Sequence, residues 1–427
     1  MKSKKFGRGM AQVCAAVALV ACSSEDDPAG DTPGAGGSGG GGNDTTEDVV
    51  EIFSWWIAPG EAEALQALVD VHKEHHQNSR IFNAAEESGD QARARLAERL
   101  NDNEPPDLFQ ENAHELPNFI AEHSGLLRPL DAFLDRMGYD QMILSEVLDN
   151  VSVDGSVYAM PVNLHRENTL YYNEQIFTDY DLTPPTTLEE FFEVCATLEA
   201  AGVAPVATAN QGWILRIMFN TIAMGSMGPE AYQAYFSGQA TGESPALRQA
   251  ITDYARVVEE YVNADWNSEA FGWTEAAQAV FEGDAAMFLH GDWATGYFEQ
   301  LGWTPGVDFG AVNAPGASEL FLYGVDAFAM PAGGPNPEGA ELFLETVGSE
   351  EGQISFNRIK GSSPMRLDVD PAQFDAIGQE TLATLRDASI RMLTPAWTDW
   401  DDAFAAYGMS SDEDALYQFF VDTYPGR

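Results

Sequence analysis

A β-strand followed by an α-helix is predicted by residues 47–72, which read EDVVEIFSWWIAPGEAEALQALVDVH. The first ten of these residues are rich in β-branched and aromatic side chains, and Pro59-Gly60 then interrupts the extended run. Beyond the interruption, the spacing i, i+3, i+4, i+7 of one helix face is occupied by Leu65, Leu68, Val69 and His72. Trp55 and Trp56 therefore lie at the carboxyl end of the strand, where open α/β sheets bind ligands.

The same alternation continues along the chain and predicts an α/β fold. A capping box at residues 187–190 opens a helix that Gly202 ends, and Thr274 is predicted to cap another helix that runs to Glu282 and that Gly283 ends. A buried strand at residues 285–289 follows directly. Further helices are predicted at 91–100 and 245–262, and a further strand at 107–110. Strands that alternate with helices in this way are typical of the α/β class.

Composition indicates a folded and strongly acidic protein. The 427 residues carry 68 Asp and Glu against 21 Lys and Arg, a formal net charge of −47, while 44% of the chain is hydrophobic and 11% is aromatic. This apolar content supports a large core, and the length corresponds to roughly two or three domains. Binding to DNA, RNA or an anionic membrane face is excluded, because phosphate groups require clustered Lys and Arg.

The N-terminus predicts an exported protein that a lipid holds at a membrane. Residues 1–21 combine a basic start with a short apolar run, which is typical of a signal peptide and too short for a permanent membrane span. Residues 19–22, Leu-Val-Ala-Cys, resemble the bacterial lipobox, in which the cysteine carries the lipid; the alternative is an ordinary cleavage site. Residues 22–48 form a Gly-rich flexible tether without aromatic side chains. We therefore expect Cys22 to anchor the protein on the outer side of a bacterial membrane, in the periplasm or at the cell surface.

Loss of the signal peptide would make the protein still more acidic. Residues 1–21 hold three lysines, one arginine and no acidic residue, so 17 basic residues would face 68 acidic ones, a formal charge of −51. Of the five lysines, only Lys73 and Lys360 would remain. Salt screens the repulsion on such a surface, and adaptation to a saline environment is therefore a hypothesis.

Motifs of common catalytic and metal chemistry are missing from the sequence. It contains no G-x-S-x-G, P-loop, H-E-x-x-H or Cys/His zinc spacing, so we expect neither metal nor cofactor. His72, His75 and His76 could bind a metal, but the apolar face favours His72 as a core residue. Cys195 has apolar neighbours at helical spacing and is also predicted in the core. Carboxylate pairs suited to glycoside hydrolysis cannot be separated from the acidic surface, which leaves a surface glycoside hydrolase as an alternative function.

Six short motifs, in this order and spacing, resemble one protein family. They are Phe53-Ser54-Trp55-Trp56, Pro105-Pro106-Asp107-Leu108-Phe109-Gln110, Pro161-Val162-Asn163-Leu164-His165-Arg166, Pro184-Pro185-Thr186-Thr187, Gly291-Asp292-Trp293-Ala294 and Lys360-Gly361-Ser362. The family is extracellular solute-binding protein family 1, the carbohydrate-binding lipoproteins of ABC transporters, and the resemblance is greatest to the glucose- and mannose-binding branch. It extends from about residue 49 to the C-terminus.

This resemblance implies two α/β lobes around a ligand cleft, with a hinge and no catalysis. Residues 49–165 and 314–350 would form the N-lobe, and residues 166–313 and 351–427 the C-lobe. The chain would cross between the lobes near 161–172 and again near 309–315. The implied partners are a sugar and the permease subunits of an ABC importer, to which a monomer delivers its ligand by lobe closure. A receptor that serves sensing rather than transport is the second alternative.

Sugar binding suits the residues that match the family's site. A pyranose presents C–H faces that pack on aromatic rings and hydroxyls that require hydrogen bonds. The predicted ligand-binding residues are Trp55, Trp56, Glu61, Gln110, Asn112, His165, Trp273, Trp293, Asp326 and Lys360. Each has a plainer alternative: a tryptophan can be core, Glu61 can favour a helix N-terminus through its charge, and Asp326 can be a strand-end surface residue.

The chain departs from the glucose-binding pattern at two positions. Glucose-binding relatives have a histidine where this chain has Asn112, and no histidine follows His290. The stretch comparable to the relatives' second histidine reads Met-Leu-Thr-Pro at residues 392–395. Because a site built to bond a given hydroxyl rejects analogues strongly, a monosaccharide other than glucose, or a small oligosaccharide, stays open.

Overall fold

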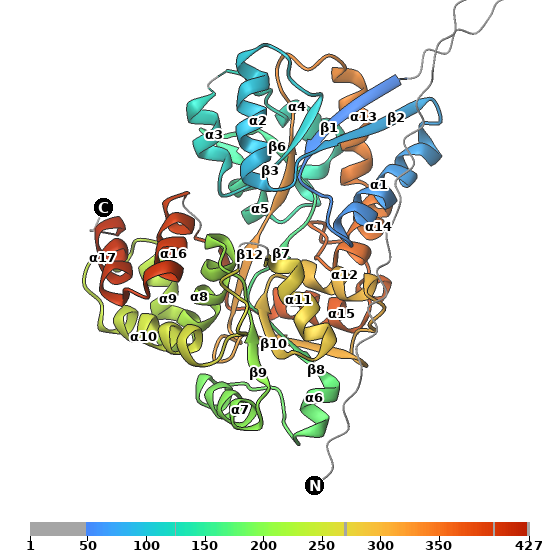
Figure 1. Cartoon of the computed structure of the whole chain (residues 1–427). Coiled ribbons are helices and arrows are strands. Elements are labelled where there is room, and N and C mark those ends of the chain that lie inside the picture. Colours follow the sequence, from blue (N-terminus) through green and yellow to red (C-terminus); the bar gives the residue numbers. More distant parts are fainter. Residues whose placement is uncertain (1–47, 124, 269–270, 396–397, 425–427) are drawn as a thin grey trace, which may run out of the picture. The chain divides into compact units, whose positions relative to one another are not determined.

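Two lobes, each built around a main sheet with its own helices and core, make up the folded part of the chain (Figure 1). The computed structural model describes residues 48–123, 125–268, 271–395 and 398–424. The predicted signal peptide, Cys22 and the tether up to residue 47 lie outside the described residues. Asp48, the last residue of the predicted tether, begins the first strand instead.

The first lobe contains a five-stranded sheet in the order β2-β1-β3-β13-β6. Strands β1, β2 and β3 run parallel, whereas β13 runs antiparallel to both β3 and β6. Strand β1 forms because alternate apolar residues bury in the core, with Val50 and Ile52 at 0% exposure. The strands are β1 (Asp48–Ser54), β2 (Ser79–Ala85), β3 (Leu108–Asn112), β6 (Ala159–Pro161) and β13 (Asp326–Ala329).

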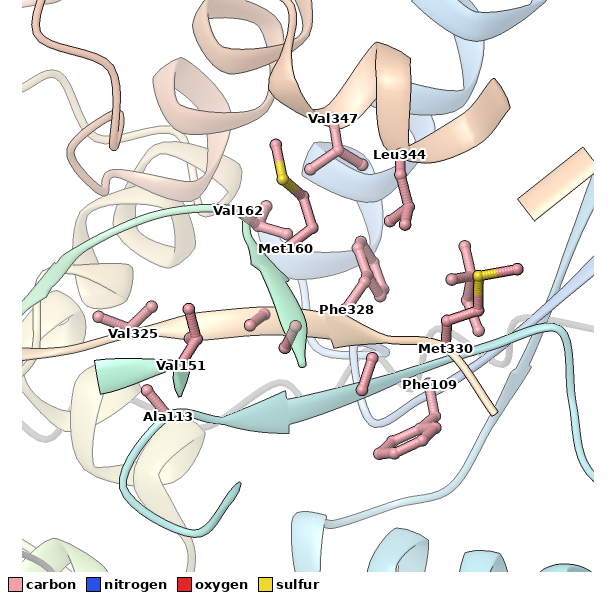
Figure 2. Close-up of a cluster of buried hydrophobic side chains, with 14 of the residues drawn as sticks. Phe109, Ala113, Val151, Met160, Val162, Val325, Phe328, Met330, Leu344 and Val347 are labelled. Atoms are coloured by element: carbon pink, nitrogen blue, oxygen red, sulfur yellow. The ribbon is translucent and has the colours of Figure 1, made fainter. Parts of the chain in front are cut away.

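Helices from both ends of the chain pack on the first lobe. Figure 2 shows Leu344 and Val347 of α13 pointing toward Phe328 of β13 in its core. The helices of this lobe are α1 (Glu61–His75), α2 (Gly89–Asn101), α3 (Leu116–Glu122), α4 (Asp131–Met137), η1 (Tyr139–Gln141), α5 (Ser145–Asn150), α13 (Pro337–Gly348) and α14 (Glu350–Lys360). Two short strands, β4 (Ser152–Val153) and β5 (Ser156–Val157), pair with each other.

The second lobe contains a four-stranded sheet in the order β11-β8-β10-β9. Its central strand β10 is buried throughout, parallel to β9 and antiparallel to β8. The strands are β8 (Thr169–Asn173), β9 (Ala204–Ala207), β10 (Ala285–His290) and β11 (Phe309–Asn313). The helices are α6 (Glu174–Asp179), α7 (Leu188–Ala201), α8 (Gly212–Met227), α9 (Pro229–Phe236), α10 (Pro245–Glu260), α11 (Trp273–Glu282), α12 (Trp293–Gln300), α16 (Thr398–Ser410) and α17 (Glu413–Thr423).

A three-stranded sheet in the order β14-β12-β7 includes the two chain segments that connect the lobes. Strand β7 (His165–Arg166) stands between β6 and β8 in sequence, and β12 (Leu320–Gly324) directly precedes β13. The third strand, β14 (Ile390–Leu393), follows η2 (Pro371–Gln373) and α15 (Ala376–Asp387). The first crossing therefore lies where the sequence predicts it. The second lies at residues 320–326 rather than at 309–315, because β11 pairs with β8 inside the second lobe.

Helix α14 departs from the predicted division of the chain. The sequence analysis assigns residues 351–427 to the second lobe, but α14 packs against α1 and α13 of the first. Phe356 of this helix joins the first core, where its ring centroid lies 5.0 Å from that of Trp56. The first lobe thus takes a larger share of the C-terminal region than predicted.

Local sequence signals otherwise predict element ends well. Thr187 accepts a hydrogen bond from the backbone of Glu190 and the reciprocal bond completes a capping box, while Gly202 ends α7 with φ of 80°. Helix α11 ends before Gly283 as predicted, but its N-cap residue is Gly272, so the predicted cap at Thr274 is wrong and Thr274 lies in the first turn. His72 and Cys195 are both buried at 0% exposure, as predicted. None of the described helices combines the length and the apolar character that a membrane crossing requires.

Candidate functional site

Asp326 is the centre of a polar cluster at the end of the first-lobe sheet. Antiparallel register places it opposite Asn112, whose Nδ2 donates to Asp326 Oδ1 at 2.7 Å. Gln110 Nε2 lies 3.4 Å from the same oxygen, and Asn163 Nδ2 lies 3.3 Å from Oδ2. The side chain of Asp326 is only 6% exposed. Four predicted or neighbouring polar residues are therefore brought together by strand pairing rather than by sequence proximity.

His165 joins this cluster to the second lobe. Its Nε2 lies 3.0 Å from Asp326 Oδ2 and its Nδ1 lies 2.5 Å from Asp292 Oδ1, just beyond the end of β10. Burial alone would lower the pKa of His165, but the charges and hydrogen bonds of the two carboxylates outweigh it and raise that pKa to about 9. At neutral pH the imidazolium therefore donates to one carboxylate from each lobe.

The contact between His165 and Asp326 also lowers the pKa of Asp326. Burial alone would raise the pKa of Asp326, but the hydrogen bond and charge of His165 hold it below its ordinary value. Asp292 accepts a further hydrogen bond from the backbone of Arg166 at 2.7 Å, which fixes its orientation. Asp326 is thus an ionised acceptor, the form that hydrogen-bonds sugar hydroxyls most strongly.

Lys360 and Glu61 form a buried ion pair between two first-lobe helices. Glu61 is the first residue of α1, Lys360 is the last residue of α14, and the ammonium donates to the Glu61 carboxylate. The lysine side chain is 2% exposed and the glutamate side chain 13%. Lys360 Nζ also lies 5.8 Å from the centroid of the Trp56 ring. The two predicted residues are therefore brought together as partners of each other.

The two adjacent tryptophans of the first lobe have different surroundings. Trp56 is 1% exposed and packs against Phe328 and Phe356, with ring centroids at 5.6 and 5.0 Å. Trp55 is partly exposed, and the Arg93 guanidinium lies 5.2 Å from its ring centroid. Trp56 is a core residue in this structure, and its contact with a ligand stays a prediction.

Three tryptophans gather in the second lobe at the starts of three helices. Trp273 and Trp293 are the first residues of α11 and α12, and Trp213 is the second residue of α8. All three are partly exposed. Trp213 lies 6.3 Å from Trp293 between ring centroids, and Trp293 lies 4.9 Å from His165. We call these three residues the tryptophan cluster.

Sequence reasoning missed several residues of this site. The sequence does not predict Trp213 or His290 as site residues, and Asn163 and Asp292 enter only as members of the family motifs. The signal for Trp213 is its place directly after Gln211-Gly212 at the start of a long apolar run, which matches the helix-start positions of the other two rings.

Among the described residues, no group of three or more His, Cys, Asp or Glu side chains comes together in a way that could hold a metal ion.

The fold and this site define a two-lobed α/β binding protein, and comparison with known proteins agrees. Residues 58–354 match the family described as bacterial extracellular solute-binding protein. An uncharacterized ABC transporter extracellular-binding protein of Pyrococcus horikoshii is 32% identical, covering 81% of this chain and 78% of the relative. A probable sugar-binding periplasmic protein of Mesorhizobium japonicum is 30% identical, covering 80% and 81%. The xylose/arabinose-binding protein of Haloferax volcanii is 27% identical, covering 79% and 74%.

Solved structures show the same fold. A bacterial solute receptor described as having an exclusive preference for β-D-galactopyranose matches with a TM-score of 0.75 at 16% identity, covering 89% of this chain and 98% of the receptor. The chain belongs to the family of bacterial extracellular solute-binding proteins. The family and the two-lobed α/β fold are thereby confirmed. Its relatives and structural neighbours are solute-binding receptors and not enzymes.

Proposed function

We propose that this protein binds a small neutral sugar between its lobes and delivers it to an ABC importer. The observation that carries the proposal is the connection through His165, which contacts the ionised Asp326 of the first lobe and the Trp293 ring of the second. One ligand beside this histidine would meet hydrogen-bonding groups on one side and aromatic rings on the other. A sugar has the matching chemistry, with hydroxyls around its rim and C–H groups on its faces.

The pairing of charges favours a neutral sugar over a sugar acid. Lys360 is neutralised by Glu61, and His165 lies between two carboxylates. Neither cation is available to a ligand carboxylate without breaking a buried ion pair, which is costly. Hydroxyls, by contrast, can both donate to Asp326 and accept from the amides of Asn112 and Gln110.

A pentose or a hexose is the proposed ligand size. Two of the three relatives have names that refer to sugars, and the protein of Haloferax volcanii is named for xylose and arabinose. Asn112 stands where the glucose-binding pattern has a histidine. Its Nδ2 donates to Asp326 Oδ1 at 2.7 Å and so orients that carboxylate. This difference is the reason to propose a neutral monosaccharide without preferring glucose.

Delivery to a transporter follows from the family and from the two-lobed architecture. The permease subunits of an ABC importer are the proposed partners, and the protein acts as a monomer. Contacts from both lobes to one ligand favour the closed state, so that lobe closure would report an occupied site to the permease. The lipid on Cys22 would keep the protein close to the membrane. In cells that express the full-length protein, Cys22→Ser should abolish lipid labelling and release the protein from the membrane fraction.

Thermal shift with a panel of sugars tests this function. D-xylose, L-arabinose, D-glucose and D-galactose should include at least one sugar that raises the melting temperature, because a ligand of the folded state stabilises it by mass action. D-glucuronate should give the smallest shift. The panel should be run at low and high salt, since the acidic surface predicts a more stable protein at high salt. Absence of any shift with all four neutral sugars would overturn the proposal.

A further inference from the structure

His290 occupies an aromatic enclosure in the second lobe. It is the last residue of β10, and it is buried at 0% exposure. Its ring centroid lies 4.3 Å from Phe288 and 4.8 Å from Trp293. The other two members of the tryptophan cluster, Trp213 and Trp273, lie at 5.4 and 5.7 Å. The whole tryptophan cluster therefore surrounds this one imidazole.

The polar atoms of His290 are not satisfied by the protein. Neither Nδ1 nor Nε2 has a hydrogen-bond partner among the residues that the structure describes. Burial without hydrogen bonds destabilises the folded state, and most buried polar groups avoid it. His72 shows the usual solution in this same chain, because its Nδ1 lies 2.8 Å from Thr346 Oγ1 and its Nε2 lies 2.9 Å from Ser79 Oγ.

The environment also fixes the protonation state of His290. Burial, followed by the nearby charges of His165 and Lys360, lowers its pKa well below the ordinary value. The ring is therefore neutral, with one N–H donor and one bare nitrogen acceptor. A hydroxyl group can both donate and accept, so either nitrogen can bond a sugar.

The location of His290 is that of a ligand site. It stands at the carboxyl end of the central strand, where β9 and β10 run parallel and where ligands bind in α/β sheets. Trp293 lies edge-on to both His290 and His165, at interplanar angles of 71° and 78°. Because this partly exposed ring contacts both imidazoles, its rotation would open both to one ligand, and side-chain rotations of this kind are common on binding.

We propose that His290 is a ligand-binding residue, which hydrogen-bonds a hydroxyl of the sugar that stacks on the tryptophan cluster. This inference rests on the proposed function and names one residue that selects the ligand. A hydroxyl at the position of His290 satisfies the imidazole only in the bound state, so a sugar that lacks it binds more weakly. The unbonded imidazole thus lowers the stability of the free protein, and its hydrogen bond to the sugar stabilises the complex.

A pair of matched variants separates this role from simple packing. His290→Phe keeps an aromatic ring and removes both nitrogens. Tyr254→Phe removes a different buried polar group, a hydroxyl that has no partner among the described residues, within the helical core of the second lobe. Both variants should melt at the same or a higher temperature than wild type without sugar. With whichever of D-xylose, L-arabinose, D-glucose or D-galactose binds wild type most tightly, His290→Phe should weaken affinity by about ten- to a hundredfold, and Tyr254→Phe by less than about twofold.

Two further measurements keep the inference open to refutation. His290→Gln, which restores a polar side chain, should recover part of the affinity lost in His290→Phe. In wild type, ring ¹⁵N signals assigned by their loss in His290→Gln should shift when the same sugar saturates the protein. Affinity of His290→Phe within about twofold of wild type, or unchanged ring signals if that variant does not fold, would overturn the inference alone. Failure of wild type to bind any of the four sugars would overturn the proposed function and the inference with it.

Discussion

The two walls of the proposed sugar site differ in how far the protein satisfies their polar groups. In the first lobe, Asp326 has four side-chain partners and Lys360 is paired with Glu61. In the second lobe, three partly exposed tryptophans surround His290, which has no partner within the described part of the chain. The first wall is held in place by contacts within the protein, whereas the second contains an imidazole that the described residues leave without a hydrogen-bond partner.

This contrast suggests a division of labour in recognition. A preorganised polar wall lowers the cost of fixing side chains on binding, but a sugar hydroxyl must replace part of an existing hydrogen-bond network. The aromatic wall supplies a surface on which the sugar can stack, and its His290 imidazole adds one group that requires a directional hydrogen bond. Affinity would then come from both walls, while stability of the free protein depends mainly on the first.

Asp326→Ala should have the largest effect. It leaves the buried His165 cation with only Asp292 as a partner, and breaking a buried ion pair costs about 3–5 kcal/mol. The free energy of unfolding, measured with urea, should fall by that amount, and calorimetry should detect no sugar binding. The exposed Asp135→Ala is the control and should leave both values unchanged. A loss of less than about 1 kcal/mol would show that the polar wall is not structural.

Trp56→Ala and Trp273→Ala should separate core from cleft. Truncation of the fully buried Trp56 should cost about 3–5 kcal/mol of unfolding free energy, as for other buried tryptophans. Trp273 is partly exposed, so its truncation should cost about 1 kcal/mol and weaken sugar affinity at least about tenfold. Equal effects of the two variants on stability would contradict the assignment of Trp56 to the core.

The pH dependence of stability should follow His165. Its pKa is about 9 in the folded protein against an ordinary 6.5, so its stabilisation is complete below pH 6.5 and is lost as pH rises through about 9. The total is about 3 kcal/mol. Urea unfolding at pH 6 and at pH 9.5 should differ by this amount more in wild type than in His165→Gln. The same slope in both proteins would show that the two carboxylates do not hold the imidazolium.

Lys360→Met should have a smaller effect on stability. Glu61, left without its partner, is partly exposed and can be solvated in part, so we expect a loss of about 2 kcal/mol. The double variant Lys360→Met/Glu61→Gln should recover some of this loss, because neither charge is left unpaired. If Lys360 also contacts the sugar, affinity stays low in the double variant. Recovery of full affinity there would assign the lysine to stability alone.

The sequence predicts more of the fold than of the site, for a physical reason. Helices such as α7 depend on local periodicity and capping, and Thr187, Glu190 and Gly202 are close together in the chain. Trp55 and Trp56 look alike in sequence, but only packing by Phe328 and Phe356 decides which ring is buried. The sequence misplaces the boundary at α14 because the main packing partner of this helix is α1, which lies at the other end of the folded chain.

Site residues were found where rarity or a motif marked them. Lys360 is one of two lysines outside the predicted signal peptide, and this rarity marks it in the sequence, but its partner Glu61 lies 299 residues away in sequence. Nothing in the local sequence distinguishes His290 from a satisfied core histidine such as His72. Only the three-dimensional surroundings separate the two, because hydrogen-bond partners come from distant elements.

Titration calorimetry of the wild-type protein with neutral monosaccharides tests the central claim most directly. Saturable binding of one sugar per protein is expected, with a negative heat-capacity change as the tryptophan rings are covered. Trp273→Ala and Asp326→Ala, which change opposite walls, should each weaken or abolish the same binding isotherm. Binding that survives unchanged in either variant, or no heat with any neutral monosaccharide, would contradict a sugar site formed by both walls.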